Sequence, residues 1–138
     1  MFKKILLAFD GSEPAKKAFD RCLEMSRSFG AQMHVVAVVR PPEFAEEVET
    51  KALIETGRNQ YSAQLERLKS LADAAGVHLT AQTRVGHPAE QIIAAAEEWQ
   101  ADLIVTGHRG RGLFERWLLG SVSRLVIAYA HCAVLVIR

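Results

Sequence analysis

Short apolar runs alternate with amphipathic segments along the whole chain, and this alternation is the feature that most restricts the fold. The runs fall at residues 5–9, 33–39, 77–85, 103–105 and 133–137. Most of them are continuously apolar, as expected for strands that are covered on both faces. Four helical stripes separate the runs, and this order predicts crossover connections between parallel strands. We therefore expect one α/β domain over residues 1–138, with a doubly wound, mostly parallel sheet and helices on both of its faces.

Start and stop signals delimit the first two predicted helices. Ser12 can cap a helix with Pro14 in its first turn, and Gly30 is well placed to end it. A second helix is predicted from Tyr61 to Gly76 on the spacing of its apolar residues. The acidic segment 43–55 in front of it is weakly patterned, and it could be a loop, a loose helix or a flap that closes over a ligand.

The last two helices are predicted in the same way. His87 and Pro88 open the third helix, and Glu90 is placed to bond back toward its cap. The residues expected on its buried face are Ile92, Ile93, Ala96 and Trp99. The fourth helix is expected to begin at Ser121, and its apolar stripe consists of Val122, Leu125, Val126 and Tyr129.

Composition and charge exclude several classes of protein. The net charge of +1 argues against a strongly electrostatic nucleic-acid binder. No apolar run approaches the ~18 residues that can span a membrane. The apolar stretch near Met1 is too short for a secretion signal and is interrupted by Asp10, so we expect a cytoplasmic protein that binds neither nucleic acid nor membrane. Cys22 and Cys132 are expected to be buried free thiols.

The segment from Thr106 to Ser123 carries glycines at positions 107, 110, 112 and 120, between a predicted strand and a predicted helix. Glycine allows main-chain N–H groups to approach a ligand closely. The helix N-terminus behind these glycines adds unpaired N–H donors and the positive end of the helix dipole. Together these features predict an anion site, most naturally for phosphate.

Asp10 follows the first predicted strand and is followed by Gly11 and Ser12. If the first and fourth strands are neighbours, the turn at Asp10 and the glycine-rich segment flank one crevice at the carboxyl ends of the strands. Asp10 could accept hydrogen bonds from a ribose hydroxyl or hold a divalent cation. The alternative is a loop residue that accepts hydrogen bonds from nearby main-chain N–H groups.

Other phosphate-binding motifs fit the chain poorly. No Gly-x4-Gly-Lys-Ser/Thr sequence occurs, which argues against a P-loop. Gly110 and Gly112 begin like a dinucleotide fingerprint, but its last glycine is missing, and the first strand–helix turn lacks the fingerprint as well. A Rossmann dehydrogenase is therefore not expected.

The spacing Gly107-x2-Gly110-x9-Gly120-Ser121, together with the turn at Asp10, resembles the ATP-binding branch of the universal stress protein family over essentially the full chain. The resemblance implies a five-stranded parallel sheet, with strand order 3-2-1-4-5, that binds ATP with Mg²⁺ or Mn²⁺ in the predicted crevice. It also implies a homodimer through strand 133–137. Pairing with a second copy would cover the main-chain groups that an edge strand leaves exposed.

Position by position, the resemblance implies contacts for particular residues of this chain. Asp10 would contact the ribose, Ala8 would line the base pocket, and Val38 would offer main-chain groups to the adenine edge. Thr106 and Gly107 would lie against the sugar and the α-phosphate. The residues expected around the phosphates are Arg109, Gly110, Gly120, Ser121, Val122 and Ser123.

The expected function is a nucleotide-dependent stress-response switch with at most slow ATP hydrolysis. Efficient phosphoryl transfer needs a residue that orients the nucleophile, and no such base is evident near the γ-phosphate. His108 lies in the glycine-rich segment and is expected to face solvent, and no pair of histidines has metal-ligand spacing. Two alternatives stay open, namely an adenine-nucleotide-using enzyme of the wider α/β superfamily and a nucleotide-free dimeric interaction module.

Overall fold

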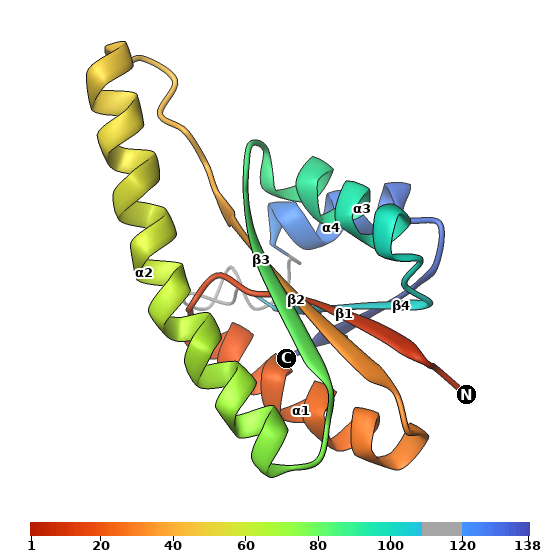
Figure 1. The fold of residues 1–138 in the computed structure, drawn as a ribbon. Helices are drawn as coiled ribbons and strands as arrows, with labels where there is room; N and C mark the ends of the chain where they lie inside the picture. Colours follow the sequence, from red (N-terminus) through yellow and green to blue (C-terminus); the bar gives the residue numbers. More distant parts are fainter. Residues whose placement is uncertain (109–119) are drawn as a thin grey trace.

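The computed structural model describes residues 1–108 and 120–138. Its strands form one five-stranded sheet in the order β3-β2-β1-β4-β5, in which all neighbouring strands are parallel (Figure 1). This arrangement confirms the predicted α/β fold and strand order. The strands are β1 (Lys4–Ala8), β2 (Gln32–Val39), β3 (Leu79–Val85), β4 (Leu103–Gly107) and β5 (Ala133–Ile137). The helices are α1 (Glu13–Phe29), α2 (Glu47–Ala74), α3 (Pro88–Trp99) and α4 (Ser121–Tyr129).

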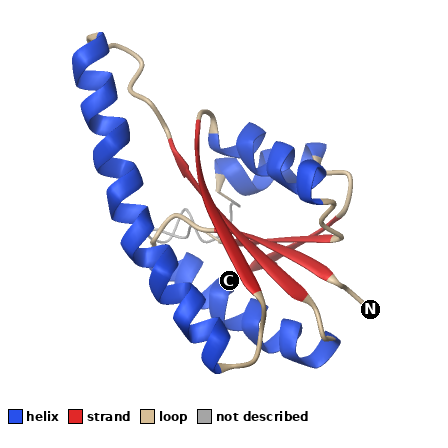
Figure 2. Cartoon of the chain, viewed as in Figure 1, coloured by secondary structure: helices blue, strands red, loops and turns tan. Residues whose placement is uncertain are grey.

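The sheet separates two apolar cores. On one face, α1 and α2 pack over a layer that includes Ile5, Leu7 and Val35. On the other face, α3 and α4 pack over Leu6 and Ile104. Figure 2 shows helices on both sides of the sheet. All five of these side chains are fully buried. Because helices cover both faces, the central strands can be apolar at every position, and this produces the continuous apolar runs in the sequence.

Helix α1 has the ends that its sequence predicts. Ser12 is its N-cap, and the Ser12 hydroxyl accepts a hydrogen bond from the Ala15 main-chain N–H at 3.3 Å. Gly30 ends the helix in the left-handed conformation, with φ 64°. Cys22 is completely buried on its inner face, as expected, whereas Cys132 near β5 is only partly buried.

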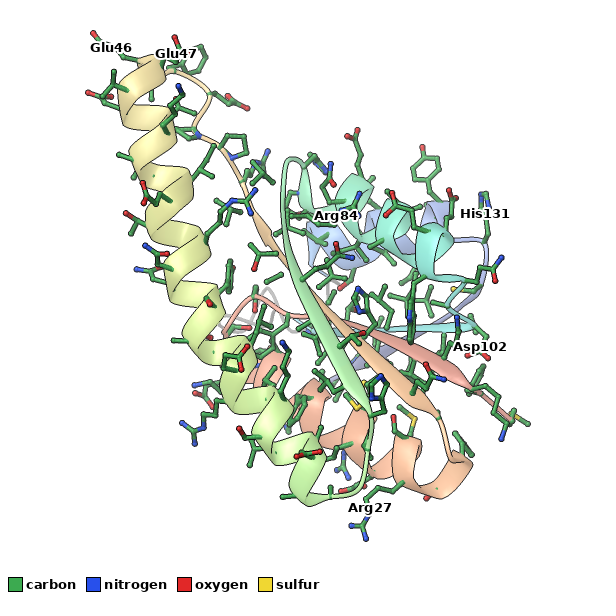
Figure 3. All side chains as sticks on the ribbon, in the orientation of Figure 1. Arg27, Glu46, Glu47, Arg84, Asp102 and His131 are labelled. Carbon is green, nitrogen blue, oxygen red and sulfur yellow. The ribbon has the colours of Figure 1, made fainter. Side chains whose placement is uncertain are left out.

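Helix α2 begins at Glu47, several turns before the predicted start at Tyr61. Residues 47–55 are therefore helical, so the loop alternative is wrong for most of the acidic segment. This part of α2 projects beyond the sheet, with Glu46 and Glu47 at its far end (Figure 3). Val48 is 79% exposed. The apolar periodicity is missing here because this part of the helix has little core to contact.

Helices α3 and α4 match their predicted positions but differ in detail. His87 precedes α3 without forming a side-chain cap hydrogen bond. Helix α4 turns Ser123 and Val126 toward the sheet, whereas Leu125 and Tyr129 are 37% and 65% exposed. The prediction that Leu125 and Tyr129 belong to the buried stripe of α4 is thus wrong. No helix in the described part of the chain is long and apolar enough to cross a membrane.

Candidate functional site

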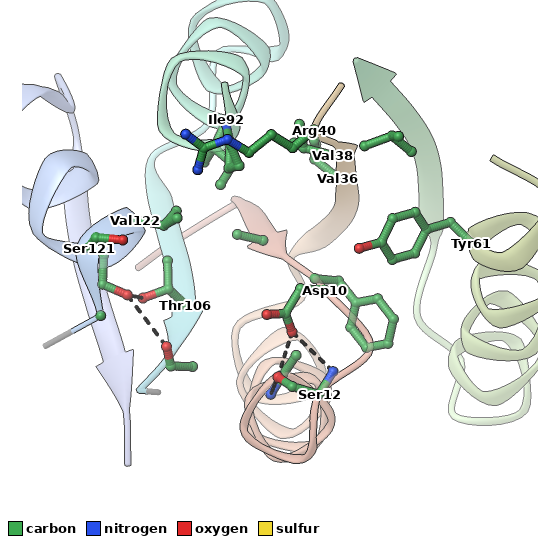
Figure 4. Close-up of a pocket in the computed structure, with 18 of the residues that line it drawn as sticks. Asp10, Ser12, Val36, Val38, Arg40, Tyr61, Ile92, Thr106, Ser121 and Val122 are labelled. Carbon is green, nitrogen blue, oxygen red and sulfur yellow. Dashed lines mark hydrogen bonds between the residues drawn. The ribbon is translucent and has the colours of Figure 1, made fainter. Parts of the chain in front are cut away.

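A cavity of about 430 Å³ opens at the carboxyl ends of the strands, where the chain order reverses between β1 and β4 (Figure 4). Doubly wound sheets bind their ligands at such a position. The predicted site residues that line the cavity are Ala8, Asp10, Val38, Thr106, Gly107, Gly120, Ser121, Val122 and Ser123. The two other predicted residues, Arg109 and Gly110, lie outside the residues that the structure describes.

The turn after β1 holds Asp10 in a defined orientation. The main-chain N–H of Ser12 donates to Asp10 Oδ1 at 3.0 Å, and the Ser12 hydroxyl donates to the same oxygen. Gly11 adopts φ 79°, a conformation that glycine tolerates and that lets the chain reverse at this point. Asp10 therefore accepts hydrogen bonds within its own turn and also lines the cavity wall (Figure 4). Its local role does not exclude a contact with a ligand.

Thr106, at the end of β4, is joined to Ser123 in the first turn of α4. Their hydroxyl oxygens are 2.9 Å apart, and both side chains are almost fully buried. The Ser123 hydroxyl also lies 3.4 Å from the main-chain carbonyl oxygen of Gly107. These contacts tie the start of α4 to the strand end, so that the helix N-terminus lies at the wall of the cavity.

Gly107 is required by the packing of the sheet against α1. A Cβ atom at this position would lie 2.7 Å from the main-chain carbon and oxygen of Pro14. Main-chain atoms cannot move aside as a flexible side chain could, so any larger residue would push β4 away from the start of α1. Gly107 thus lets the first turn of α1 approach the cavity closely.

The N-terminus of α4 is a potential anion site. Gly120 is the N-cap residue, and no side chain forms a cap hydrogen bond there. The first turn of a helix has main-chain N–H groups without helical partners and the positive end of the dipole. Ser121, at the first helical position, is exposed and lines the cavity. These features fit the negative charge of a phosphate group.

Helix α2 supplies a wall of the cavity that the sequence did not reveal. Gly57, Gln60 and Tyr61 line it. Tyr61 continues the apolar stripe of α2 and was expected only to pack against the core. Gly57 lies before the predicted start of this helix at Tyr61, so its place inside α2 becomes evident only in the structure.

Arg40 brings a positive charge to the mouth of the cavity. It follows β2 directly, and its side chain extends across the opening toward Ile92 (Figure 4). Among the described residues, no carboxylate forms an ion pair with Arg40. The positive charge of Arg40 could therefore attract an anionic ligand in the cavity.

The histidines differ from expectation at one position. His108 is 7% exposed rather than facing solvent, and its main-chain N–H donates to the carbonyl oxygen of Ile137 at 2.7 Å. His108 Nε2 is a buried nitrogen with no hydrogen-bond partner among the described residues. The described residues also contain no group of three or more His, Cys, Asp or Glu side chains that could hold a metal ion.

His34, also buried, has a structural environment away from the cavity. Its Nδ1 lies 2.6 Å from the Thr80 hydroxyl, and its Nε2 lies 2.8 Å from the Gln82 amide nitrogen. The Trp99 ring lies beside it, with the ring centroids 5.2 Å apart. Burial, followed by the positive charge of Arg84, lowers the pKa of His34 below its usual value. These contacts favour neutral imidazole that receives a hydrogen bond at Nε2.

Comparisons with known proteins agree with this geometry. The family model of the universal stress protein family matches residues 1–138. A universal stress protein of Thermus aquaticus is 37% identical over 139 residues, covering 100% of both chains. The solved structure of universal stress protein UspA from Lactobacillus plantarum has a TM-score of 0.88 and 23% identity, over 99% of this chain and 98% of the other.

A further solved structure connects the fold with a ligand. It is a universal stress protein in complex with cAMP, with a TM-score of 0.76 and 25% identity, over 99% of this chain and 97% of the other. The match of the family model over the whole chain, and the identity to a full-length relative, decide the family. The protein described here belongs to the universal stress protein family.

Proposed function

We propose that this protein is an ATP-binding switch whose shape or partners change when the nucleotide binds. The observation that carries the proposal is a cavity that is lined both by Asp10 and by the N-terminus of α4. A nucleotide needs an apolar place for its base, acceptors for its sugar hydroxyls and donors for its phosphates. The described walls offer all three kinds of group.

In this proposal the base lies near Ala8 and Val38, and the ribose lies at Asp10. The phosphates lie at the residues from Gly120 to Ser123, together with Arg109 and Gly110. The cAMP complex of a related universal stress protein supports the choice of an adenine nucleotide. Mg²⁺ or Mn²⁺ would be held mainly by the phosphates and water, because the described residues form no metal-binding cluster.

Hydrolysis of the bound nucleotide would be slow. Rapid phosphoryl transfer requires a group that orients the attacking water and a metal site that is already assembled. Asp10 would lie at the sugar, away from the γ-phosphate. The protein would therefore act through binding, which suits a regulator rather than an enzyme.

We also propose a cytoplasmic homodimer that pairs through β5. This strand lies at one edge of the sheet, and among the described strands it pairs only with β4. Its outward main-chain groups would be covered by a second copy related by a two-fold axis. Exposed Ile127 and Tyr129 on α4 add apolar surface outside the two cores.

Isothermal titration with Mg-ATP, at a stated salt concentration, tests the proposed function. We expect one nucleotide per chain, and we expect a Gly120→Val variant that still folds to lose affinity because its side chain narrows the approach to α4. As a control, Gly30→Ala changes a glycine at the end of α1, where φ 64° strains an alanine without touching the cavity, and a folded variant should bind as the original protein does. A folded protein that binds no adenine nucleotide would refute the proposal and favour an interaction module.

A further inference from the structure

His34 is a polar side chain buried in the layer between the sheet and α3. It lies in the middle of β2, beside Leu6 of β1 and Thr80 of β3, and it is only 8% exposed. Its Nδ1 lies 2.6 Å from the Thr80 hydroxyl, and its Nε2 lies 2.8 Å from the Gln82 amide nitrogen. Because an amide nitrogen only donates hydrogen bonds, Nε2 is the acceptor here, and this arrangement holds the ring neutral.

Trp99, the last residue of α3, connects the His34 ring to this helix. The two ring centroids are 5.2 Å apart, and the ring planes are tilted by 31°. From β1, the Lys4 ammonium lies 5.2 Å from the centroid of the Trp99 ring and donates to the Trp99 carbonyl oxygen at 3.0 Å. His34 and Lys4 therefore hold the carboxyl-terminal end of α3 on the sheet through Trp99.

The charged groups around His34 oppose a positive charge on its ring. Burial, followed by the positive charge of Arg84 on β3, lowers the pKa of His34. Lys4 of β1 places a second cation beside Trp99. From α3, Glu98 brings a carboxylate to this region, but it is exposed and pairs with Arg84 at 2.8 Å. Neither hydrogen-bond partner of the ring carries a charge.

A proton on Nε2 would disrupt the present contacts of His34. The new N–H would face the amide N–H of Gln82, so that two donors would meet. Turning the Gln82 amide over would present its oxygen instead, but it would add no negative charge to offset Lys4 and Arg84. A charged ring is therefore more stable in water than in this position. It reaches water when Trp99 and the end of α3 move away from it.

We propose that His34 is an acid-sensitive switch: when its ring takes up a proton, the carboxyl-terminal end of α3 is released from the sheet while the rest of the domain stays folded. Histidine suits this role because its charge changes between about pH 5 and pH 8. The other end of α3 carries Pro88 and Ile92, which line the cavity, so release of the helix would also alter the cavity wall. The inference does not depend on which ligand the cavity binds.

Hydrogen exchange of main-chain amides in the full chain, followed by mass spectrometry and corrected for the intrinsic effect of pH, tests this inference. We expect the protection of residues 93–99 to fall by at least about threefold between pH 7.5 and pH 5.5. Helix α1, on the opposite face of the sheet, should keep its protection over the same range. His34→Gln cannot take up a proton, so protection of residues 93–99 should not change with pH in this variant.

Gln82→Glu separates the charge of His34 from its packing. The new carboxylate would accept a hydrogen bond from Nε2–H and pair with the charged ring, so the ring can be protonated while α3 stays on the sheet. We expect this variant to keep its protection at pH 5.5, although NMR titration should show a higher pKa for its His34. His78→Gln, at an exposed position, is the matched control and should lose protection as the original protein does.

Three results would overturn the inference. The first is unchanged protection of residues 93–99 down to pH 5.5 in the original protein. The second is an equal loss of protection in α1 and α3, which would show unfolding of the whole domain. The third is a loss in folded His34→Gln or Gln82→Glu as large as in the original protein. The comparison of α1 with α3 in the original protein needs no variant, and urea unfolding at pH 7.5 confirms that each variant is folded.

Discussion

The hydroxyl oxygens of Thr106 and Ser123 lie 2.9 Å apart in a buried contact that joins the end of β4 to the first turn of α4. Thr106 is fixed by the sheet, and Ser123 is fixed by the helix. Their hydrogen bond therefore sets where the α4 N-terminus stands relative to the strand ends. This placement is what allows main-chain donors of α4 to face the same cavity as Asp10.

The first prediction concerns the energy of this contact. Ser123→Ala leaves the Thr106 hydroxyl buried without that partner, so we expect a loss of about 1–2 kcal/mol in the free energy of unfolding. Adding Thr106→Val removes the second hydroxyl, and the double variant should lose less than the sum of the two single variants. Urea unfolding of all four proteins measures the coupling. Strict additivity would contradict the structural role given to this pair.

The second prediction concerns Arg40. Removing its charge with Arg40→Gln should lower the affinity for ATP by roughly threefold to tenfold. The affinity for adenosine should fall by less than about twofold, because the attraction grows with the charge of the ligand. The difference should shrink at high salt. Arg27→Gln is the matched control, since Arg27 lies in the last turn of α1. Equal losses for ATP and adenosine would show that Arg40 acts on the nucleoside instead.

The third prediction concerns acid stability. Burial lowers the folded-state pKa of His34 below its usual value of 6.5. The unfolded chain therefore takes up a proton at His34 before the folded protein does, and stability is lost as the pH falls from about 6.5 toward the folded-state pKa. We expect His34→Gln to reduce the loss of urea midpoint between pH 7.5 and pH 5.5. His78→Gln, at an exposed position, serves as the control and should lose as much urea midpoint as the original protein. An equal loss of midpoint in all three proteins would contradict the role given to His34.

The fourth prediction concerns the two thiols. Burial raises the pKa of Cys22 to about 12, so its reactive thiolate is scarce at neutral pH and is also shielded. Cys132 is partly exposed, although burial and the Asp102 carboxylate raise its pKa as well. Iodoacetamide followed by mass spectrometry should label Cys132 slowly in the folded protein and both residues in urea. Labelling of Cys22 before Cys132 in the folded protein would contradict the structure.

The sequence was most informative where packing leaves a periodic trace. The apolar runs of β1 and β4 are buried on both faces, and the caps Ser12 and Gly30 perform their local roles. Asp10 could be placed on the cavity because the carboxyl ends of neighbouring parallel strands meet at one edge. Apolar periodicity, helix capping and the alignment of parallel strand ends are properties of short segments, and the rest of the fold leaves them unchanged.

The features that were missed depend on contacts between distant segments. The start of α2 has no apolar stripe because it projects beyond the sheet, so only its acidic first turn marks it. Tyr61 is part of an apolar stripe, and only the three-dimensional structure shows that its hydroxyl reaches the cavity. His108 follows a buried strand in a polar, glycine-rich sequence, which gave no sign that its ring is buried.

A crystal structure of the protein grown with Mg²⁺ and a non-hydrolysable ATP analogue tests the central claim most directly. The account predicts density for the sugar within hydrogen-bond reach of Asp10, and density for the phosphates at the main-chain N–H groups from Gly120 to Ser123. A cavity that stays closed by the protein's own side chains, or a nucleotide bound elsewhere on the molecule, would contradict it.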